Sequence, residues 1–134
     1  MSDKILLYGD YQSMRVLLLF WLETLLPEKQ IIVAEDIYQA VTLAQQHRPR
    51  LVVLNTDSFS PVEIETIRQL RQNLPGAPIV VLTNNGISGL LRDALLAGAD
   101  ICVSVDVFRE QIQPILQTLI HAEMAPGYRG DLQI

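Results

Sequence analysis

The sequence feature that most constrains the fold is a short, uninterrupted apolar run at residues 51–54, Leu-Val-Val-Leu. It is followed at once by Asn55, Thr56 and Asp57 and then by a turn containing serine and proline. A strand buried on both faces has such a continuous run, whereas a strand with one exposed face alternates apolar and polar residues. Residues 51–54 are therefore predicted to form a central strand of a parallel sheet. The polar residues after it are predicted to lie where such sheets carry their sites.

Strands and helices alternate along the whole chain. Apolar runs predict five strands, at residues 4–8, 31–34, 51–54, 78–83 and 101–104. Helical spacing and end residues predict five helices, at residues 13–26, 37–47, 61–73, 90–97 and 108–121. This alternation favours right-handed crossovers and a sheet covered on both faces. We expect one α/β domain at residues 1–122, a doubly wound parallel sheet in the order 2-1-3-4-5, and a C-terminal tail at residues 123–134.

Composition excludes several classes of partner. The 134 residues are 49% hydrophobic, enough for one domain with a sizeable core. A net charge of −5 gives no broad basic surface, so we expect no direct contact with nucleic acid or with an anionic membrane. The longest apolar run, residues 16–22, is far shorter than the roughly 20 residues of a membrane span. The single cysteine, Cys102, cannot form an internal disulfide, and residues 1–10 do not resemble a signal peptide, so we expect a cytoplasmic protein.

The predicted strand order brings several polar residues to one end of the sheet. The first and third strands are neighbours in this order, and both end in polar residues. Asp10, Asn55 and Asp57 should therefore lie close together. Thr83 and the end of the fifth strand should lie beside them.

In their order and spacing, four segments resemble the receiver domains of two-component response regulators. They are KILLYGD at residues 4–10, LVVLN at 51–55, PIVVLT at 78–83 and ALLAGADICVSVD at 94–106. The resemblance covers about residues 4–121 and implies a flavodoxin-like fold. In that family an acidic pair after the first strand binds Mg²⁺ and an aspartate ending the third strand accepts a phosphoryl group. A threonine or serine ends the fourth strand, and a lysine ends the fifth.

Carried over to this chain, the family's site is depleted. The acidic pair falls on Gly9 and Asp10, and the phosphoacceptor falls on Asn55. Thr83 matches the hydroxyl position, but the lysine position falls on Val105. An amide is a poor nucleophile, one carboxylate weakens a Mg²⁺ site, and valine supplies no cation for a phosphoryl oxygen.

These losses predict a degenerate receiver, or pseudo-receiver, that works by protein–protein interaction and without aspartyl phosphorylation. We expect no enzymatic activity and no cofactor. Mg²⁺ is not expected either, and Asp10 is the one candidate ligand for it.

Three residues of this site leave alternatives open. Asp57 is either a displaced phosphoacceptor or metal ligand, or a loop residue that stabilises its own turn. Asp10 is either a remaining metal ligand or an acidic partner of a helix N-terminus. The hydroxyl of Thr83 can simply satisfy local backbone groups. Two functional alternatives follow, namely a phosphorylation switch that uses Asp57 and a small-molecule sensor that uses the vacated pocket.

The helix predicted at residues 13–26 is too apolar for a single buried stripe. At about 100° per residue, one face should point toward the core. That predicted core face comprises Met14, Leu17, Leu18, Trp21 and Leu25. Val16, Leu19 and Phe20 fall on the other side, where a contiguous apolar patch marks an interaction surface. These three residues are the predicted contact for a protein partner or a homodimer.

Other arrangements would also account for the apolar helix. Its register could differ, or the tail could fold over the patch through Met124, Tyr128 or Leu132. Helix 90–97 raises a similar question, because it contains Leu90, Leu91, Leu95 and Leu96. The resemblance implies a second candidate dimer face there, formed by this helix, the fifth strand and the fifth helix.

Overall fold

The computed structural model describes residues 4–56, 60–83, 91–111 and 114. The predictions for Asp57, for Leu90 and for the tail at residues 123–134 lie outside the described residues. Five strands form one parallel sheet in the order β2-β1-β3-β4-β5, which confirms the predicted order. The strands are β1 (Lys4–Gly9), β2 (Gln30–Ala34), β3 (Leu51–Asn55), β4 (Ile79–Thr83) and β5 (Ile101–Ser104).

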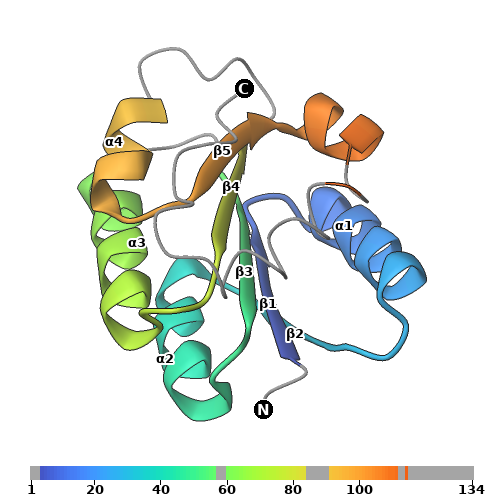
Figure 1. The fold of residues 1–134 in the computed structure, drawn as a ribbon, viewed down its shortest axis with the longest axis horizontal. Coiled ribbons are helices and arrows are strands. Elements are labelled where there is room, and N and C mark those ends of the chain that lie inside the picture. The colour runs from blue at the N-terminus through green and yellow to red at the C-terminus, as the bar shows by residue number, and fades with distance from the viewer. Residues whose placement is uncertain (1–3, 57–59, 84–90, 112–113, 115–134) are drawn as a thin grey trace.

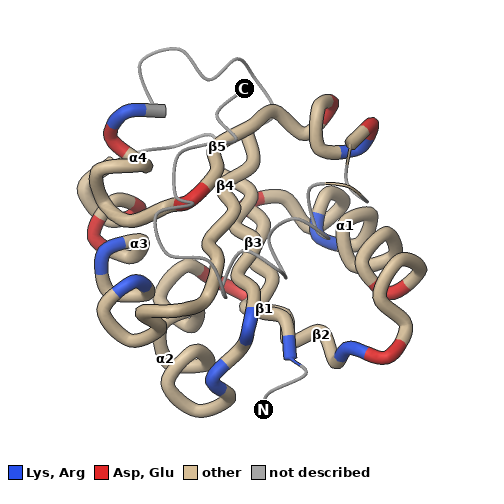
Figure 2. The backbone as a smooth tube through the Cα atoms, viewed as in Figure 1, with Lys and Arg blue, Asp and Glu red and all other residues tan. Residues whose placement is uncertain are grey.

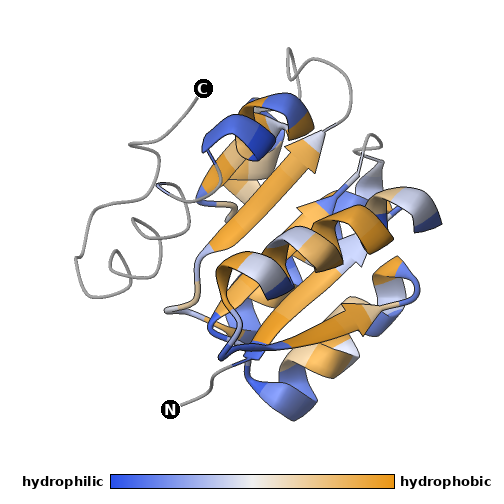
Figure 3. Ribbon diagram, turned by 90° about the vertical axis from the view of Figure 1, so that its right-hand side faces the viewer, coloured by the Kyte–Doolittle hydropathy of each residue, from blue (hydrophilic) through white to orange (hydrophobic). Residues whose placement is uncertain are grey.

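The helices cover both faces of the sheet (Figure 1). They are α1 (Gln12–Leu25), α2 (Ile37–His47), α3 (Pro61–Asn73) and α4 (Leu91–Ala97), and residues 105–111 are helical as well. One apolar core joins α2, α3 and α4 to the sheet, and a second joins α1 and the helical residues after β5 to the opposite face. β3 and β4 are buried along their whole length because both faces are covered. The strands in Figure 3 are mostly coloured as apolar.

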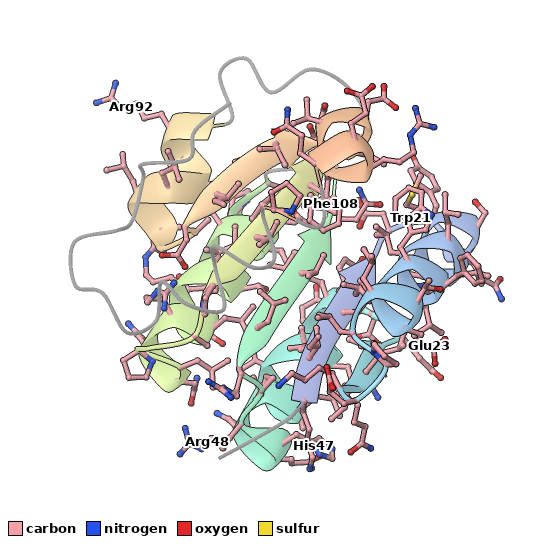
Figure 4. All side chains as sticks on the ribbon, turned by 45° about the vertical axis from the view of Figure 1, so that its right-hand side comes forward. Trp21, Glu23, His47, Arg48, Arg92 and Phe108 are labelled. Carbon is pink, nitrogen blue, oxygen red and sulfur yellow. The ribbon has the colours of Figure 1, made fainter. Side chains whose placement is uncertain are left out.

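The helix after β5 begins earlier than the sequence predicts. Helical residues start at Val105, directly after the strand, whereas the prediction placed the start near Phe108. The hydroxyl of Ser104 accepts a hydrogen bond from the Val107 N–H at 3.2 Å, as a helix N-cap does. Phe108 is fully buried and points from this helix toward the sheet (Figure 4).

The buried face of α1 agrees with the prediction in part, because four of the five predicted residues lie in or against the core, namely Met14, Leu18, Trp21 and Leu25. Leu18 and Leu22 are fully buried, and Leu22 was absent from the predicted core face. Leu17 is 40% exposed, so its predicted burial is wrong. Leu19 is partly buried and packs against the core, so its predicted exposure is wrong too. Apolar residues surround most of this helix, and periodicity alone therefore does not fix which side faces the sheet.

A buried ion pair ties three segments together at the end of the sheet opposite the C-terminal strand ends. Arg71 of α3 contacts the Asp100 carboxylate at 2.5 Å and donates to the carbonyl oxygens of Gly98, at 3.0 Å, and Ala77, at 2.8 Å. Asp100 also accepts from the Ile79 N–H at 2.8 Å. The pair therefore fixes the end of α3, the start of β4 and the turn before β5.

Candidate functional site

The C-terminal ends of the strands bring together Asp10, Asn55 and Thr83, three of the residues that the sequence assigns to one site. Gly9 pairs in register with Asn55, and Asn55 pairs with Leu82. The Asp10 N–H donates to the backbone carbonyl of Asn55 at 3.0 Å. Thr83 is buried at the end of β4, next to Ser104. Parallel pairing thus places one carboxylate, one amide and one hydroxyl at the same edge.

Asn55 is held as a hydrogen-bond donor. Its side chain is completely buried, and its Nδ2 donates to the backbone carbonyl of Leu82 at 3.2 Å. Because that carbonyl can only accept, the amide nitrogen has to face it, and the Oδ1 atom points elsewhere. Oδ1 is buried and finds no donor in the part of the chain that the structure describes. An aspartate carboxylate in the same place would present a second acceptor to the Leu82 oxygen.

The Asp10 carboxylate is hydrogen-bonded to a tyrosine. The hydroxyl of Tyr8 donates to Oδ1 of Asp10 at 2.8 Å. Burial, followed by the hydrogen bond and negative charge of Asp10, raises the pKa of Tyr8 above its ordinary value. The contact was not predicted from the sequence, although residues two apart on an extended segment point to the same side.

Gly9 stands where the family has the first acidic residue, and the stem of Arg15 covers it. A Cβ atom added at Gly9 would lie 2.6 Å from Cγ of Arg15. The guanidinium Nη1 of Arg15 donates to the carbonyl oxygen of Glu35 at 2.9 Å, just after β2. The resemblance implies Mg²⁺ at this edge, but the residues do not fit it. Among the described residues, Asp10 is the carboxylate that remains from the acidic pair, and the cationic side chain of Arg15 lies beside it over Gly9. The Asn55 amide adds only a neutral oxygen, Oδ1, because its Nδ2 donates to Leu82.

Val105, at the family's lysine position, belongs to the core. It is 8% exposed and packs with Phe108 in the core on the α1 side of the sheet. Nearby, Cys102 is fully buried, and burial raises the pKa of its thiol to about 11. Neither side chain supplies a positive charge or a reactive group at the strand ends.

Metal-binding clusters and membrane-spanning helices are both absent from the described ranges. Within residues 4–56, 60–83, 91–111 and 114, no three His, Cys, Asp or Glu side chains are grouped so as to hold a metal ion. No helix in those ranges has the length and apolarity needed to cross a membrane.

The outward side of α1 is apolar, but it differs from the predicted set. Val16 is 61% exposed and Phe20 is 62% exposed, whereas Leu19 is turned inward. Leu17 takes its place, and we call Val16, Leu17 and Phe20 the α1 surface. The outward-facing side of α1 is prominent in the view of Figure 3. On the second candidate face, Leu96 of α4 is strongly exposed.

Comparison with known proteins gives matches by structure only. No protein family model matches the sequence, and no curated protein matches it closely. A LuxR family two-component response regulator from Aurantimonas sp. SI85-9A1 superposes with a TM-score of 0.77 at 23% identity, covering 96% of this chain and 93% of that one. A response regulator receiver domain from Clostridium thermocellum gives a TM-score of 0.77 at 15% identity, covering 92% and 98%.

A third similar structure was determined in a phosphorylated state. It is a response regulator from Burkholderia pseudomallei with a phosphorylated aspartic acid, a calcium ion and citrate. The TM-score is 0.73 at 23% identity, over 91% of this chain and 72% of that chain. Strand order, helix placement and these superpositions agree, so the chain has the flavodoxin-like fold of response regulator receiver domains.

Proposed function

We propose that this domain acts in signal transduction by protein–protein contact and without phosphorylation of an aspartate. The observation that carries the proposal is the orientation of Asn55, whose amide donates to the Leu82 carbonyl from a fully buried position. A phosphoacceptor needs a carboxylate oxygen that is free to attack phosphorus. An amide supplies no such oxygen, and here it is used to link the ends of β3 and β4.

The surroundings of Asn55 support the same proposal. The side chain of Arg15 covers Gly9, at the position of the family's first acidic residue. The Tyr8 hydroxyl donates a hydrogen bond to Oδ1 of Asp10, and Val105 is part of the core. Metal binding and phosphoryl binding in the family use a second carboxylate and a lysine. At the described positions that correspond to these residues, the chain has Gly9, Asn55 and Val105 instead. The domain is accordingly proposed to be a non-enzymatic binding module. A single, buried cysteine suits a cytoplasmic location.

The test is incubation of the purified protein with Mg²⁺ and acetyl phosphate, followed by intact-protein mass spectrometry. A phosphorylatable response regulator treated in parallel is the positive control. We expect no added phosphoryl group on this chain. A phosphoryl adduct that disappears in Asp57→Ala would overturn the proposal and show that a displaced aspartate serves as acceptor.

The α1 surface is the proposed contact. It combines one aromatic and two aliphatic side chains that are exposed on one helix, whereas the core side of the same helix is filled by Leu18 and Leu22. Exposed apolar patches of this kind mark interaction sites. The exposure of this surface in the structure described here supports a contact that needs no phosphorylation.

A further inference from the structure

We infer that the α1 surface of one copy docks into a groove between α2 and α3 of a second copy, so that copies associate head to tail. This inference rests on the proposed function, because it names the partner for the α1 surface. It depends on three features of the chain, namely the groove, the distribution of charge, and the positions of both surfaces in the fold.

The groove has the size and lining needed to accept an apolar side chain. We call it the α2–α3 groove, and its volume is about 330 Å³. Its lining includes Tyr38, Val41, Pro61, Val62, Thr66 and Gln69. A cavity of about 150 Å³ is sufficient to bind benzene. The groove can therefore accept the ring of Phe20 together with part of a neighbouring aliphatic side chain.

Apolar groups are also exposed around this groove. Tyr38 of α2 is 70% exposed and Val62 of α3 is 38% exposed. Tyrosine is enriched at protein interfaces because its ring is apolar and its hydroxyl remains able to hydrogen-bond. The chain therefore has a projecting apolar surface on α1 and a concave one between α2 and α3.

Both surfaces are nearly free of net charge, although the chain carries a net charge of −5. The eleven residues of α2 include no Lys, Arg, Asp or Glu, and α1 has only Arg15 and Glu23. The one carboxylate that lines the groove, Glu65, forms an ion pair with Arg68 at 2.6 Å. Figure 2 shows α1 and α2 as mostly uncharged. Charge depletion characterises interface centres, and like-charged copies repel least when these two faces meet.

The positions of the two surfaces determine the kind of assembly. α1 lies on one face of the sheet, and α2 and α3 lie on the other (Figure 1). A contact between two different surfaces of the same chain is heterologous and leaves one α1 surface and one α2–α3 groove unoccupied at the ends. Further copies can then add, so the average mass should keep rising with concentration.

The association should be weak. A helix of 14 residues is about 21 Å long and about 10 Å wide with its side chains, so its outward face offers a few hundred Å². Stable complexes bury about 800 Å² per partner. We therefore expect dissociation constants on the order of micromolar to millimolar.

The experiment is sedimentation velocity of the full chain over this concentration range, with Phe20→Glu and Val62→Glu as variants. Each variant alone should remain monomeric, because each has lost one of the two surfaces. An equimolar mixture should form a heterodimer and nothing larger, since Phe20→Glu keeps the α2–α3 groove and Val62→Glu keeps the α1 surface. Gln46→Glu, at an exposed position of α2 that does not line the groove, is the matched charge control and should associate like the unmodified chain.

The variants should fold, and circular dichroism with thermal melting checks this. Phe20 is exposed, and Val62 lies in the first turn of α3, where an acidic residue is favourable. A monomeric unmodified chain at the highest concentration would overturn the inference, as would a mixture that stays monomeric. Association that Phe20→Glu abolishes and Val62→Glu leaves intact would also overturn it, while leaving α1 as a contact surface. The acetyl phosphate experiment tests the proposed function separately.

Discussion

Replacing Asn55 by aspartate restores the family's phosphoacceptor residue and should destabilise this protein. The change removes the Nδ2 donor to the Leu82 carbonyl, a hydrogen bond worth about 0.5–1.5 kcal/mol. It also places a carboxyl group at a site with no solvent exposure. Burial favours the protonated acid, which can still donate to the Leu82 oxygen, so the variant's carboxyl pKa should rise in the folded state.

The cost should therefore depend on pH. The folded-state pKa lies above the unfolded value of about 3.9, so the penalty is small below about pH 4 and grows as the pH rises toward the folded-state pKa. If the carboxyl pKa is one unit higher in the folded state, the free energy of unfolding falls by about 1.4 kcal/mol once the pH exceeds both pKa values. At pH 7, about three pH units above the unfolded pKa, up to about three such units can contribute. Complete burial can raise a carboxyl pKa by up to about 3–5, so the loss at pH 7 should reach about 3–4 kcal/mol.

Urea denaturation followed by circular dichroism at pH 4 and pH 7 measures this difference. Asn55→Leu is the matched control, because it removes the amide without adding a titratable group and should show no added pH dependence. Equal stability of Asn55→Asp and the unmodified chain at both pH values would refute the reasoning. It would mean that the site accepts a carboxylate as readily as the amide.

Three further predictions concern stability. Arg71→Ala should lower the free energy of unfolding by about 3–5 kcal/mol in urea denaturation, because it leaves the Asp100 carboxylate buried without its ion-pair partner; Arg71→Lys should recover only part of this loss. Gly98→Ala should lower the melting temperature, because Gly98 has φ +130° and a new Cβ would lie 2.7 Å from Cβ of Arg71; an unchanged melting temperature would contradict this. Tyr8 has a raised pKa in the folded state, so its contribution to stability is present below about pH 10 and lost as the pH rises further. Tyr8→Phe should therefore lower stability by about 1 kcal/mol at pH 7 and make its decline above pH 10 less steep in urea denaturation, and an unchanged slope would count against the contact with Asp10.

Much of the fold could be predicted from sequence because the strands are buried on both faces. The runs at residues 51–54 and 78–83 have no polar break, so their identity as central strands of a parallel sheet did not depend on periodicity. Polar residues directly after those runs then located Asn55 and Thr83 at the C-terminal edge. For these two strands, the local sequence pattern and the burial seen in the structure both indicate a central position in the sheet.

The remaining features depend on tertiary packing. Three residues of α1 were misassigned, because Leu17, Leu19 and Leu22 are equally apolar and only contact with the sheet distinguishes them. The path of Arg15 over Gly9 follows from a long side chain that crosses between elements, and no local pattern encodes it. The α2–α3 groove likewise exists only after two helices have packed side by side.

The Tyr8–Asp10 hydrogen bond differs from these cases. Its two residues are two apart at the end of a predicted strand, so the spacing was available in the sequence. The start of the last helix was available as well, because Ser104 is a favourable N-cap residue before Val105.

The measurement that most directly tests the central claim is an amide NMR titration of the purified protein, first with Mg²⁺ and then with beryllofluoride, which mimics an acyl phosphate. A site built around the Asn55 amide should give no shifts at Asp10, Asn55 and Thr83 in either step. Saturable shifts at these three residues would contradict the claim. They would show that the strand ends still bind the metal and the phosphoryl analogue.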